Sequence, residues 1–425
     1  MKKLSMIKNF MLVVLAFNGM QLAEAQESNA DQSYTLVVEG YDWGPATSKV
    51  ILHLSDTTSV AEGANYSIDV LRESDCLDAN SPRSKGTLQV VTAYVSDAEG
   101  NKMETGKNIT LHVGVGPHIQ IGSPIVYFFT EGCRGNQWTN YQLTITNSKN
   151  KSIWNKESDR IMPLVDEFDL SGKFSSNNVD LTYASFSPKM GEGKKPLIIW
   201  LHGGGEGGTD PSIVLLANRA ANYASNEIQK IFGGAYVLTP QTPTRWMHGI
   251  SGETTRGNEP DIYSETLMDL IKDFVSKHPD IDSNRIYVGG CSNGGYMTQE
   301  LLLNNPDYFA AAYPSALAFF AEFLSEDDIR SLAKQSIWYM HSKDDPVTKA
   351  DVTVIPTFDL LMKAGAKDVH LSLYDHVVDL YGVYGGNDYH LNGHFSWVYS
   401  HRNHASKVID GQEVTVMEWM AGKSK

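Results

Sequence analysis

The stretch Arg285–Leu303, RIYVGGCSNGGYMTQELLL, decides the fold of the second half of this 425-residue chain. It begins with β-branched and aromatic residues, as strands do, and from Tyr296 onward it consists of helix-forming residues. Between the two parts, Gly290–Gly294 matches the pattern G-x-S-x-G with Ser292 at its centre. A serine in a tight turn between a strand and a helix is the arrangement of a nucleophile elbow. An ordinary glycine-rich turn is the alternative, so the surrounding segments have to decide between them.

Strand-like and helix-like segments alternate on both sides of this stretch. Strands are expected at residues 179–186, 197–201, 235–238, 285–288, 309–313, 336–340 and 369–374, and helices at 213–224, 262–277, 296–304 and 348–364. This alternation predicts an α/β domain over residues 165–425, with a mostly parallel sheet covered by helices on both faces. Ligands of such sheets bind at the carboxyl ends of the strands, where Ser292 is expected.

The first part of the chain has a different character. Residues 33–150 contain β-branched and aromatic runs at 34–39, 49–54, 87–95 and 141–146, separated by turn-forming segments. Short strands at such intervals predict an all-β sandwich domain. The polar stretch 147–163, rich in Asn, Ser and Lys, is interpreted as a linker to the α/β domain.

The N-terminus has the pattern of a secretory signal peptide. Lys2, Lys3 and Lys8 accompany the apolar run Phe10–Phe17, and Ala23–Ala25 fits the cleavage site. A buried N-terminal helix is the alternative. We therefore expect residues 1–25 to be a signal peptide and the protein to be exported, as a periplasmic or secreted protein.

The net charge of the chain narrows the class of binding partner. The formal charge of −15 argues against nucleic acid and anionic membranes as partners, and no apolar run is long enough to span a membrane.

Cys76 and Cys133 could form a disulfide in an oxidising compartment, while Cys291 is expected to be a buried thiol. Three free thiols or a different pair remain alternatives, because sequence does not fix connectivity.

A second glycine-rich segment follows the strand at 197–201. His202-Gly203-Gly204-Gly205 would allow backbone N–H groups to point at one spot with no side chain in the way, as an oxyanion hole requires. The N–H of Asn293 would supply the second donor. A phosphate-binding loop and a plain flexible loop are the alternatives, although the G-K-[ST] ending of a P-loop is missing.

Candidates for an acid and a base come later in the chain. Asp344 and Asp345 follow the strand at 336–340, and His376, His390 and His394 follow the last strand. The order Ser, Asp, His is the one an α/β-hydrolase requires. The spacing of His390 and His394 also fits a metal site, but the glycine and asparagine between them argue against the helix such a site needs, so we expect no metal.

Several segments give the chain a specific resemblance. LHGGGEGGTD, AYVLTPQTPTRWM, VGGCSNGGYMT, HSKDDPV and GHFSW resemble secreted α/β-hydrolase esterases of the polyhydroxybutyrate depolymerase and feruloyl esterase-like group and, more distantly, prolyl oligopeptidase-like hydrolases. GYDWGPATSKVILHL and AYVSDAEGN resemble the Ig-like N-terminal domain that some of these esterases carry. The resemblance covers nearly all of the chain after the signal peptide.

The resemblance assigns roles to the triad candidates. It implies that Ser292 is the nucleophile and that His394, in G-H-x-S-W, is the base in preference to His390. Asp345 fits the acid of an H-G-x-x-D turn. Ser342 replaces the glycine of that turn, which leaves Asp344 open as a substitute.

The resemblance also extends to the residues around the triad. Gly204 fits an oxyanion donor together with Asn293, although three adjacent glycines blur the register. Trp246 matches an aromatic residue near the site, with core packing as the alternative.

The expected reaction is hydrolysis of a carboxylic ester through an acyl-enzyme, with no cofactor. The substrate would be a small-molecule or polysaccharide-linked ester. A prolyl oligopeptidase-like serine peptidase and a catalytically silent binding protein on the same fold are the alternatives. The sequence does not predict the oligomeric state.

Overall fold

The computed structural model describes residues 32–130 and 132–425, which belong to one compact unit. The predicted signal peptide at 1–25 lies outside the described residues. Among the helices of the described part, none has the length and apolar character needed to cross a membrane.

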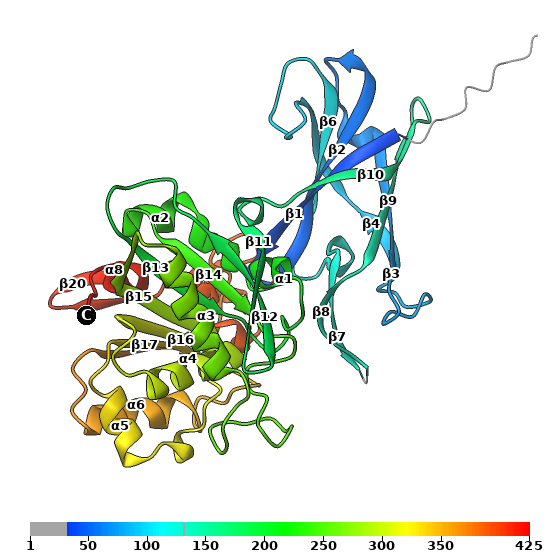
Figure 1. Ribbon diagram of the computed structural model, residues 1–425. Helices are drawn as coiled ribbons and strands as arrows, with labels where there is room; N and C mark the ends of the chain where they lie inside the picture. The colour runs from blue at the N-terminus through cyan, green and yellow to red at the C-terminus, as the bar shows by residue number, and fades with distance from the viewer. Residues whose placement is uncertain (1–31, 131) are drawn as a thin grey trace, which may run out of the picture. The chain divides into compact units, whose positions relative to one another are not determined.

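The N-terminal part is β-rich, as its sequence pattern predicted, and its main sheet contains eight strands (Figure 1). Its order is β4-β3-β9-β10-β1-β2-β6-β5, and its edge strand β5 packs against the short helix before β3, so the sheet folds over on itself. Inward-facing residues alternate with outward-facing ones, for example Tyr141, Leu143 and Ile145 in β9. The bounds are β1 Gln32–Tyr41, β2 Gly44–Thr58, β3 Tyr66–Glu73, β4 Lys85–Leu88, β5 Val90–Ser96, β6 Gly106–Val113, β9 Asn140–Asn147 and β10 Ile153–Ile161.

The interpretation of residues 147–163 as a linker is wrong for most of that stretch. Ile153–Ile161 forms β10, which pairs in parallel with β1 and antiparallel with β9. Its Trp154 is buried and donates from Nε1 to the carbonyl of His53 at 2.9 Å. The strand was missed because most of its side chains are polar and face outward, so its place in the sheet depends on backbone pairing.

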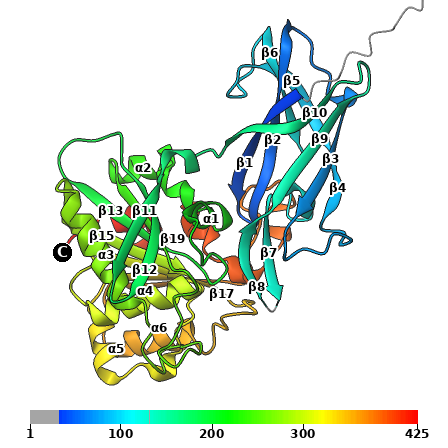
Figure 2. The ribbon, with the colours of Figure 1, turned by 45° about the vertical axis from the view of Figure 1, so that its right-hand side comes forward.

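A separate two-stranded hairpin is formed by β7 Ile125–Thr130 and β8 Cys133–Trp138 (Figure 2). A disulfide joins Cys133, at the turn of this hairpin, to Cys76 in the loop after β3. Arg83 from the same loop donates to the carbonyl of Tyr127 at 3.1 Å and lies over the ring of Phe128. The hairpin is therefore tied to the first sheet by a covalent bond and by an arginine. Of the pairings left open by the sequence, Cys76–Cys133 is the one the structure contains.

The second sheet has the predicted α/β architecture. Its order is β11-β12-β14-β13-β15-β16-β17-β18, and all pairs from β14 to β18 are parallel, whereas β11 and β12 pair antiparallel with their neighbours. The bounds are β11 Asp169–Ser176, β12 Val179–Phe186, β13 Lys195–Leu201, β14 Tyr236–Gln241, β15 Ile281–Cys291, β16 Ala311–Ser315, β17 Ile337–Ser342 and β18 Val369–Tyr374.

Helices cover both faces of this sheet, so its central strands are buried on both sides and read as continuous apolar runs. Alternate residues of β13 enter two different cores: Ile199 packs with α3 to α6, and Trp200 packs with α1, α2, α7 and α8. The bounds are α1 Pro211–Ala217, α2 Asn226–Phe232, α3 Ser264–Lys277, α4 Asn293–Asn304, α5 Glu326–Leu332, α6 Val354–Lys363, α7 Val398–His401 and α8 Val416–Ala421. The predicted α/β-hydrolase class is confirmed at the level of the fold.

Candidate active site

Ser292 lies at the carboxyl edge of the second sheet, between β15 and α4. Its backbone adopts φ 56° and ψ −111°, a conformation that non-glycine residues rarely occupy. Its N–H donates to the carbonyl of Ser315, at the end of the neighbouring strand β16, at 3.0 Å. Such strain persists only where the surroundings enforce it, and it is the backbone feature of a nucleophile elbow.

The glycines around Ser292 are required by the close crossing of strand and helix. A Cβ on Gly294 would lie 1.9 Å from the carbonyl oxygen of Leu201 in β13. A Cβ on Gly290 would lie 2.6 Å from the same oxygen and 2.5 Å from that of Gly294. The G-x-S-x-G pattern therefore encodes a place where three backbone segments meet, which an ordinary glycine-rich turn does not need.

The structure brings Asp345 and His394 together. His394 Nδ1 lies 2.8 Å from Asp345 Oδ2 and 3.0 Å from Oδ1. Because a carboxylate only accepts hydrogen bonds, Nδ1 carries the proton and Nε2 is left as the basic nitrogen. Asp345 also accepts from the N–H groups of Val347 and Thr348 and from the Thr348 hydroxyl, so the carboxylate is held rigidly. Helix α6 begins at Val354, six residues after the start that was predicted from the sequence.

Two opposing effects set the pKa of Asp345. Burial raises it, but the hydrogen bond and charge of His394 and the hydrogen bonds from Thr348 outweigh burial, so the pKa lies below its ordinary value. The neighbouring His341 is buried and has its pKa lowered mainly by that burial. It accepts from the N–H of Leu317 at Nδ1, which leaves its Nε2–H to donate to the Thr348 carbonyl. Asp345 therefore stays a carboxylate beside a neutral imidazole.

Asp344 engages a different histidine. Its Oδ2 lies 2.8 Å from His376 Nδ1, and His376 in turn stacks on His390 with ring centroids 3.9 Å apart. Its Oδ1 accepts from the hydroxyl of Ser342. Ser342, which replaces the expected glycine, thus helps to hold Asp344 in its contact with His376.

No group of three His, Cys, Asp or Glu side chains arranged to hold a metal ion occurs in residues 32–130 and 132–425.

Ser292 and Asp345 follow strands at the same carboxyl edge of the sheet, and His394 belongs to the segment after β18. Ser292 follows β15 and Asp345 follows β17, with β16 between them, so their backbones are roughly 10 Å apart at the usual strand spacing. In the part of the chain that is described, no hydrogen bond links the Ser292 hydroxyl to His394. Hydrogen bonds of this kind are often long without substrate and tighten in the complex.

The two residues expected to supply the oxyanion donors, Gly204 and Asn293, lie next to each other. A Cβ on Gly204 would lie 2.8 Å from Asn293 Nδ2, so the glycine loop passes directly over the residue that follows Ser292. His202 is buried at the start of this loop, where its Nε2 accepts from the N–H of Thr242 and its Nδ1 lies 2.6 Å from the Gly203 carbonyl. Burial lowers the pKa of His202 to about 4, so it remains a neutral support of the loop.

Two residues behind this loop, Asn136 and Glu206, were not predicted from the sequence. Asn136 Nδ2 donates to Glu206 Oε1 at 2.8 Å, and the Asn136 N–H donates to the Gly205 carbonyl at 2.6 Å. Burial raises the pKa of Glu206 to about 7, against the lowering effect of Asn136. Asn136 belongs to β8, more than 60 positions before the loop in the chain, so no local pattern could reveal the contact.

Trp246 and Cys291 are core residues in this structure. Trp246 is fully buried, and its ring packs against those of His202 and Tyr263. This position fits the core-packing alternative, in which Trp246 supports the glycine loop through its contact with His202. Cys291 is a buried free thiol, and burial followed by the charge of Glu206 raises its pKa, so it remains protonated.

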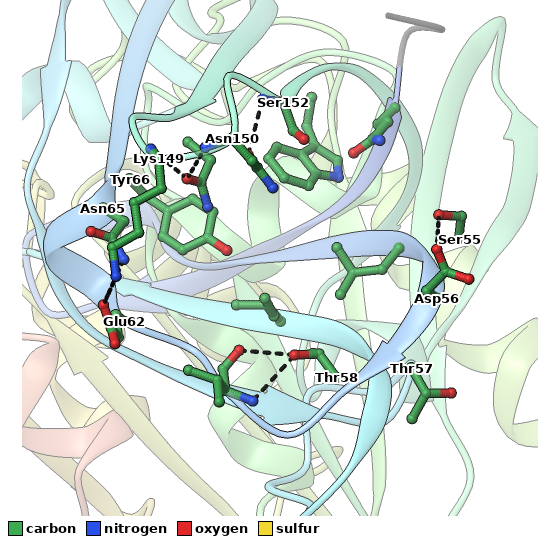
Figure 3. A pocket seen from close by; sticks show the side chains of 16 residues that line it. Ser55, Asp56, Thr57, Thr58, Glu62, Asn65, Tyr66, Lys149, Asn150 and Ser152 are labelled. Atoms are coloured by element: carbon green, nitrogen blue, oxygen red, sulfur yellow. Dashed lines mark hydrogen bonds and ion pairs between the residues drawn. The ribbon is translucent and has the colours of Figure 1, made fainter. Parts of the chain in front are cut away.

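A cavity of about 370 Å³ lies in the N-terminal domain (Figure 3). Most of its lining side chains are polar, and the others are Leu54, Val60, Tyr66, Ile109 and Trp154. The Lys149–Glu62 ion pair closes one side of it. None of the triad candidates lines this cavity, so it is a separate feature of the N-terminal domain.

Comparison with known families assigns the two parts of the chain. Residues 33–157 match the model of the esterase Ig-like N-terminal domain, and residues 252–359 match the prolyl oligopeptidase family. The second match contains the elbow at Ser292 and also Asp345. The sequence matches none of the curated proteins with which it was compared.

Solved structures with a similar fold include a thermostable esterase. It is 21% identical, has a TM-score of 0.73, and the alignment covers 92% of this chain and 100% of that one. The acylaminoacyl peptidase of Pyrococcus horikoshii is 18% identical with a TM-score of 0.37, covering 52% of this chain and 39% of that one. A ferulic acid esterase is 14% identical with a TM-score of 0.37, covering 48% and 88%. The thermostable esterase thus shares the fold of this chain over almost its whole length.

Proposed function

We propose that this α/β-hydrolase chain, in which an esterase Ig-like N-terminal domain precedes a prolyl oligopeptidase family region, hydrolyses carboxylic esters through an acyl-enzyme. The two family matches support a serine hydrolase. The observation that carries the proposal is the Asp345–His394 hydrogen bond at the same sheet edge as the strained Ser292.

In the proposed mechanism the Ser292 hydroxyl attacks the ester carbonyl carbon while His394 Nε2 removes its proton. The negative charge that develops on the carbonyl oxygen would be stabilised by the N–H groups of Gly204 and Asn293. The tetrahedral intermediate then collapses, and the imidazolium of His394 donates the proton to the leaving alcohol. Asp345 fixes the Nδ1–H tautomer and stabilises the transient positive charge.

Water completes the second half of the reaction. It attacks the acyl-Ser292 carbonyl, His394 Nε2 takes its proton, and collapse of the second intermediate releases the carboxylic acid. The proton returns from His394 to Ser292, so the enzyme is regenerated. These steps use only side chains and backbone groups of this chain.

A serine peptidase is the second candidate, because the region 252–359 matches the prolyl oligopeptidase family. The same triad geometry serves esters and amides, so the substrate decides. The test is hydrolysis of a short p-nitrophenyl ester and of a peptide p-nitroanilide, by the wild-type protein and by Ser292→Ala. Ester turnover that disappears in the variant supports the proposal. Turnover of the anilide alone would favour the peptidase, and no turnover of either would favour a silent binding protein.

We also propose that the protein is exported, with a small-molecule or polysaccharide-linked ester as substrate. The Cys76–Cys133 disulfide supports an oxidising compartment, where such bonds persist. Detection of the protein in the periplasmic or extracellular fraction, with an N-terminus after residue 25, tests the export.

A further inference from the structure

We propose that Asn136 is a positioning residue for the oxyanion loop, which is the glycine-rich loop at residues 202–206. The β7–β8 hairpin of the N-terminal domain would then contribute to the geometry of the active site. The inference rests on the proposed function, because it concerns the loop that would stabilise the oxyanion. Two hydrogen bonds join the hairpin to residues 203–206. One is the bond from the Asn136 side chain to Glu206, and the other is the bond from the Asn136 N–H to the Gly205 carbonyl.

The close approach of the two segments depends on the shape of the hairpin. Gly135 has φ +91°, and a Cβ there would lie 2.8 Å from the Gly205 carbonyl oxygen. On the other strand, the half-exposed Tyr127 covers Gly205, where an added Cβ would lie 2.9 Å from its ring. The hairpin therefore fits the loop at backbone distance, with glycines on both sides of the contact.

Glu206 connects the hairpin to the part of the loop that precedes the expected donor, Gly204. Its second carboxyl oxygen lies beside Gly203, where an added Cβ would be 3.0 Å away. The N–H of Glu206 turns back to the Gly203 carbonyl, and the Glu206 carbonyl accepts from Gln241 at the end of β14. Three glycines in a row have little conformational preference of their own. The orientation of the Gly204 N–H is then set by the anchors at the two ends, His202 on one side and Glu206 with Asn136 on the other.

Asn136 is the side chain that anchors this carboxyl, which also interacts with the backbone of Gly203 and of Glu206 itself. The titratable groups that face Glu206 are Tyr127 from β7 and Cys291 from β15, and burial raises the pKa of both. Both are therefore neutral near pH 7. Neither hydrogen-bonds to Glu206 in the described chain, so the amide of Asn136 is the side-chain donor that holds it.

The first test compares Asn136→Ala with a matched control, Asn140→Ala. Asn140, on β9 of the same domain, also donates to a glutamate, Glu73, at 3.0 Å, but at an exposed site. We expect kcat for a p-nitrophenyl ester to fall roughly 10- to 100-fold in Asn136→Ala with KM nearly unchanged, because a misdirected oxyanion donor weakens only transition-state binding. The control should retain wild-type kcat. Equal kcat for Asn136→Ala and wild type would overturn the inference and leave the proposed function standing.

The second test separates positioning from general stability. Glu206→Gln keeps an acceptor for Asn136 and should keep kcat close to wild type, whereas Glu206→Ala should resemble Asn136→Ala. The double variant Asn136→Ala/Glu206→Ala should be no worse than either single variant, because both remove one anchor. Additive losses in the double variant would count against a shared role. An inactive wild type would remove the proposed function and this inference together.

If Asn136→Ala does not fold, the isosteric Asn136→Asp carries the test. It places a second carboxyl against Glu206, so the pair can share a proton at low pH but repels at high pH. We expect the ratio of variant to wild-type kcat to be low at pH 8 and to recover toward pH 6. Taking the ratio to wild type at each pH removes the pH dependence that the two proteins share. A ratio that stays constant with pH would contradict the proposed role.

Discussion

His394 Nδ1 lies 2.8 Å from Asp345 Oδ2, although 49 positions separate the two residues in the chain. Asp344, the immediate neighbour of Asp345, instead pairs with His376 at 2.8 Å. Two adjacent carboxylates thus serve two different histidines, since consecutive side chains after a strand point in different directions. This arrangement gives a sharp way to test which of them is catalytic.

Asp345→Asn should lower kcat/KM for a p-nitrophenyl ester by roughly 10³- to 10⁴-fold, because an amide does not stabilise the imidazolium or enforce the Nδ1–H tautomer. Asp344→Asn should remain close to wild type. It differs from the first variant by one position and the same chemical change, which makes it the matched control. Steady-state kinetics with circular dichroism as a folding check measure both. A larger loss in Asp344→Asn would transfer the role of acid to that residue.

Ser292→Ala and His394→Ala should each lower kcat by roughly 10⁴- to 10⁶-fold. The double variant should be no worse than either single variant, because nucleophile and base act as one unit. His390→Ala is the control, since His390 stacks on His376 and not on the triad. Additive losses in the double variant, or an inactive His390→Ala, would show that His394 is not the base.

Much of the α/β part could be predicted because each local pattern has a local physical cause. The fully buried strand β13 reads as the continuous apolar run Leu197–Leu201, and the glycines around Ser292 record backbone contacts that exclude a side chain. The elbow was therefore visible in the sequence as a strand, a G-x-S-x-G turn and a helix.

The rest depends on contacts between distant parts of the chain. Strand β10 has polar outward-facing side chains, and its place beside β1 comes from backbone pairing that composition does not reveal. Glu206 looks like a loop carboxylate in the sequence, yet it is buried against Asn136. The choice between Asp344 and Asp345 likewise required the positions of both histidines.

Glu206→Gln should change how stability depends on pH. The pKa of Glu206 is raised to about 7 in the folded protein from an ordinary value of 4.5, so the folded state binds a proton more tightly than the unfolded state. Stability from this group is therefore present below pH 4.5 and is lost as pH rises through 7, by up to about 3 kcal/mol. The variant removes this loss.

The measurement is the midpoint of urea unfolding at pH 5 and at pH 8. We expect the midpoint of Glu206→Gln, relative to wild type, to be higher at pH 8 than at pH 5. Glu73→Gln serves as a control, because Glu73 also accepts a hydrogen bond from an asparagine, Asn140, but is exposed to solvent. An equal difference at the two pH values would mean that Glu206 is already ionised at pH 5 in the fold.

The disulfide should support activity as well as stability, because Cys133 lies at the turn of the hairpin that carries Asn136. The bond closes a segment with a sequence separation of 57, so its removal should destabilise the protein by about 4 kcal/mol in the chain-entropy picture. We expect Cys76→Ser/Cys133→Ser to lower kcat severalfold at a temperature well below its Tm. The remaining free thiol, Cys291, is buried and should not complicate the comparison.

Two measurements on the same samples separate the effects. Thermal unfolding gives the loss of stability, and ester hydrolysis at a temperature where both proteins are fully folded gives the loss of kcat. Combining the cysteine variant with Asn136→Ala should add little to the loss of kcat from Asn136→Ala alone, because both changes act through the contact between β8 and residues 205–206. A cysteine variant that is destabilised but has wild-type kcat would mean that the hairpin keeps its contact with the oxyanion loop without the disulfide. The disulfide would then contribute to stability alone.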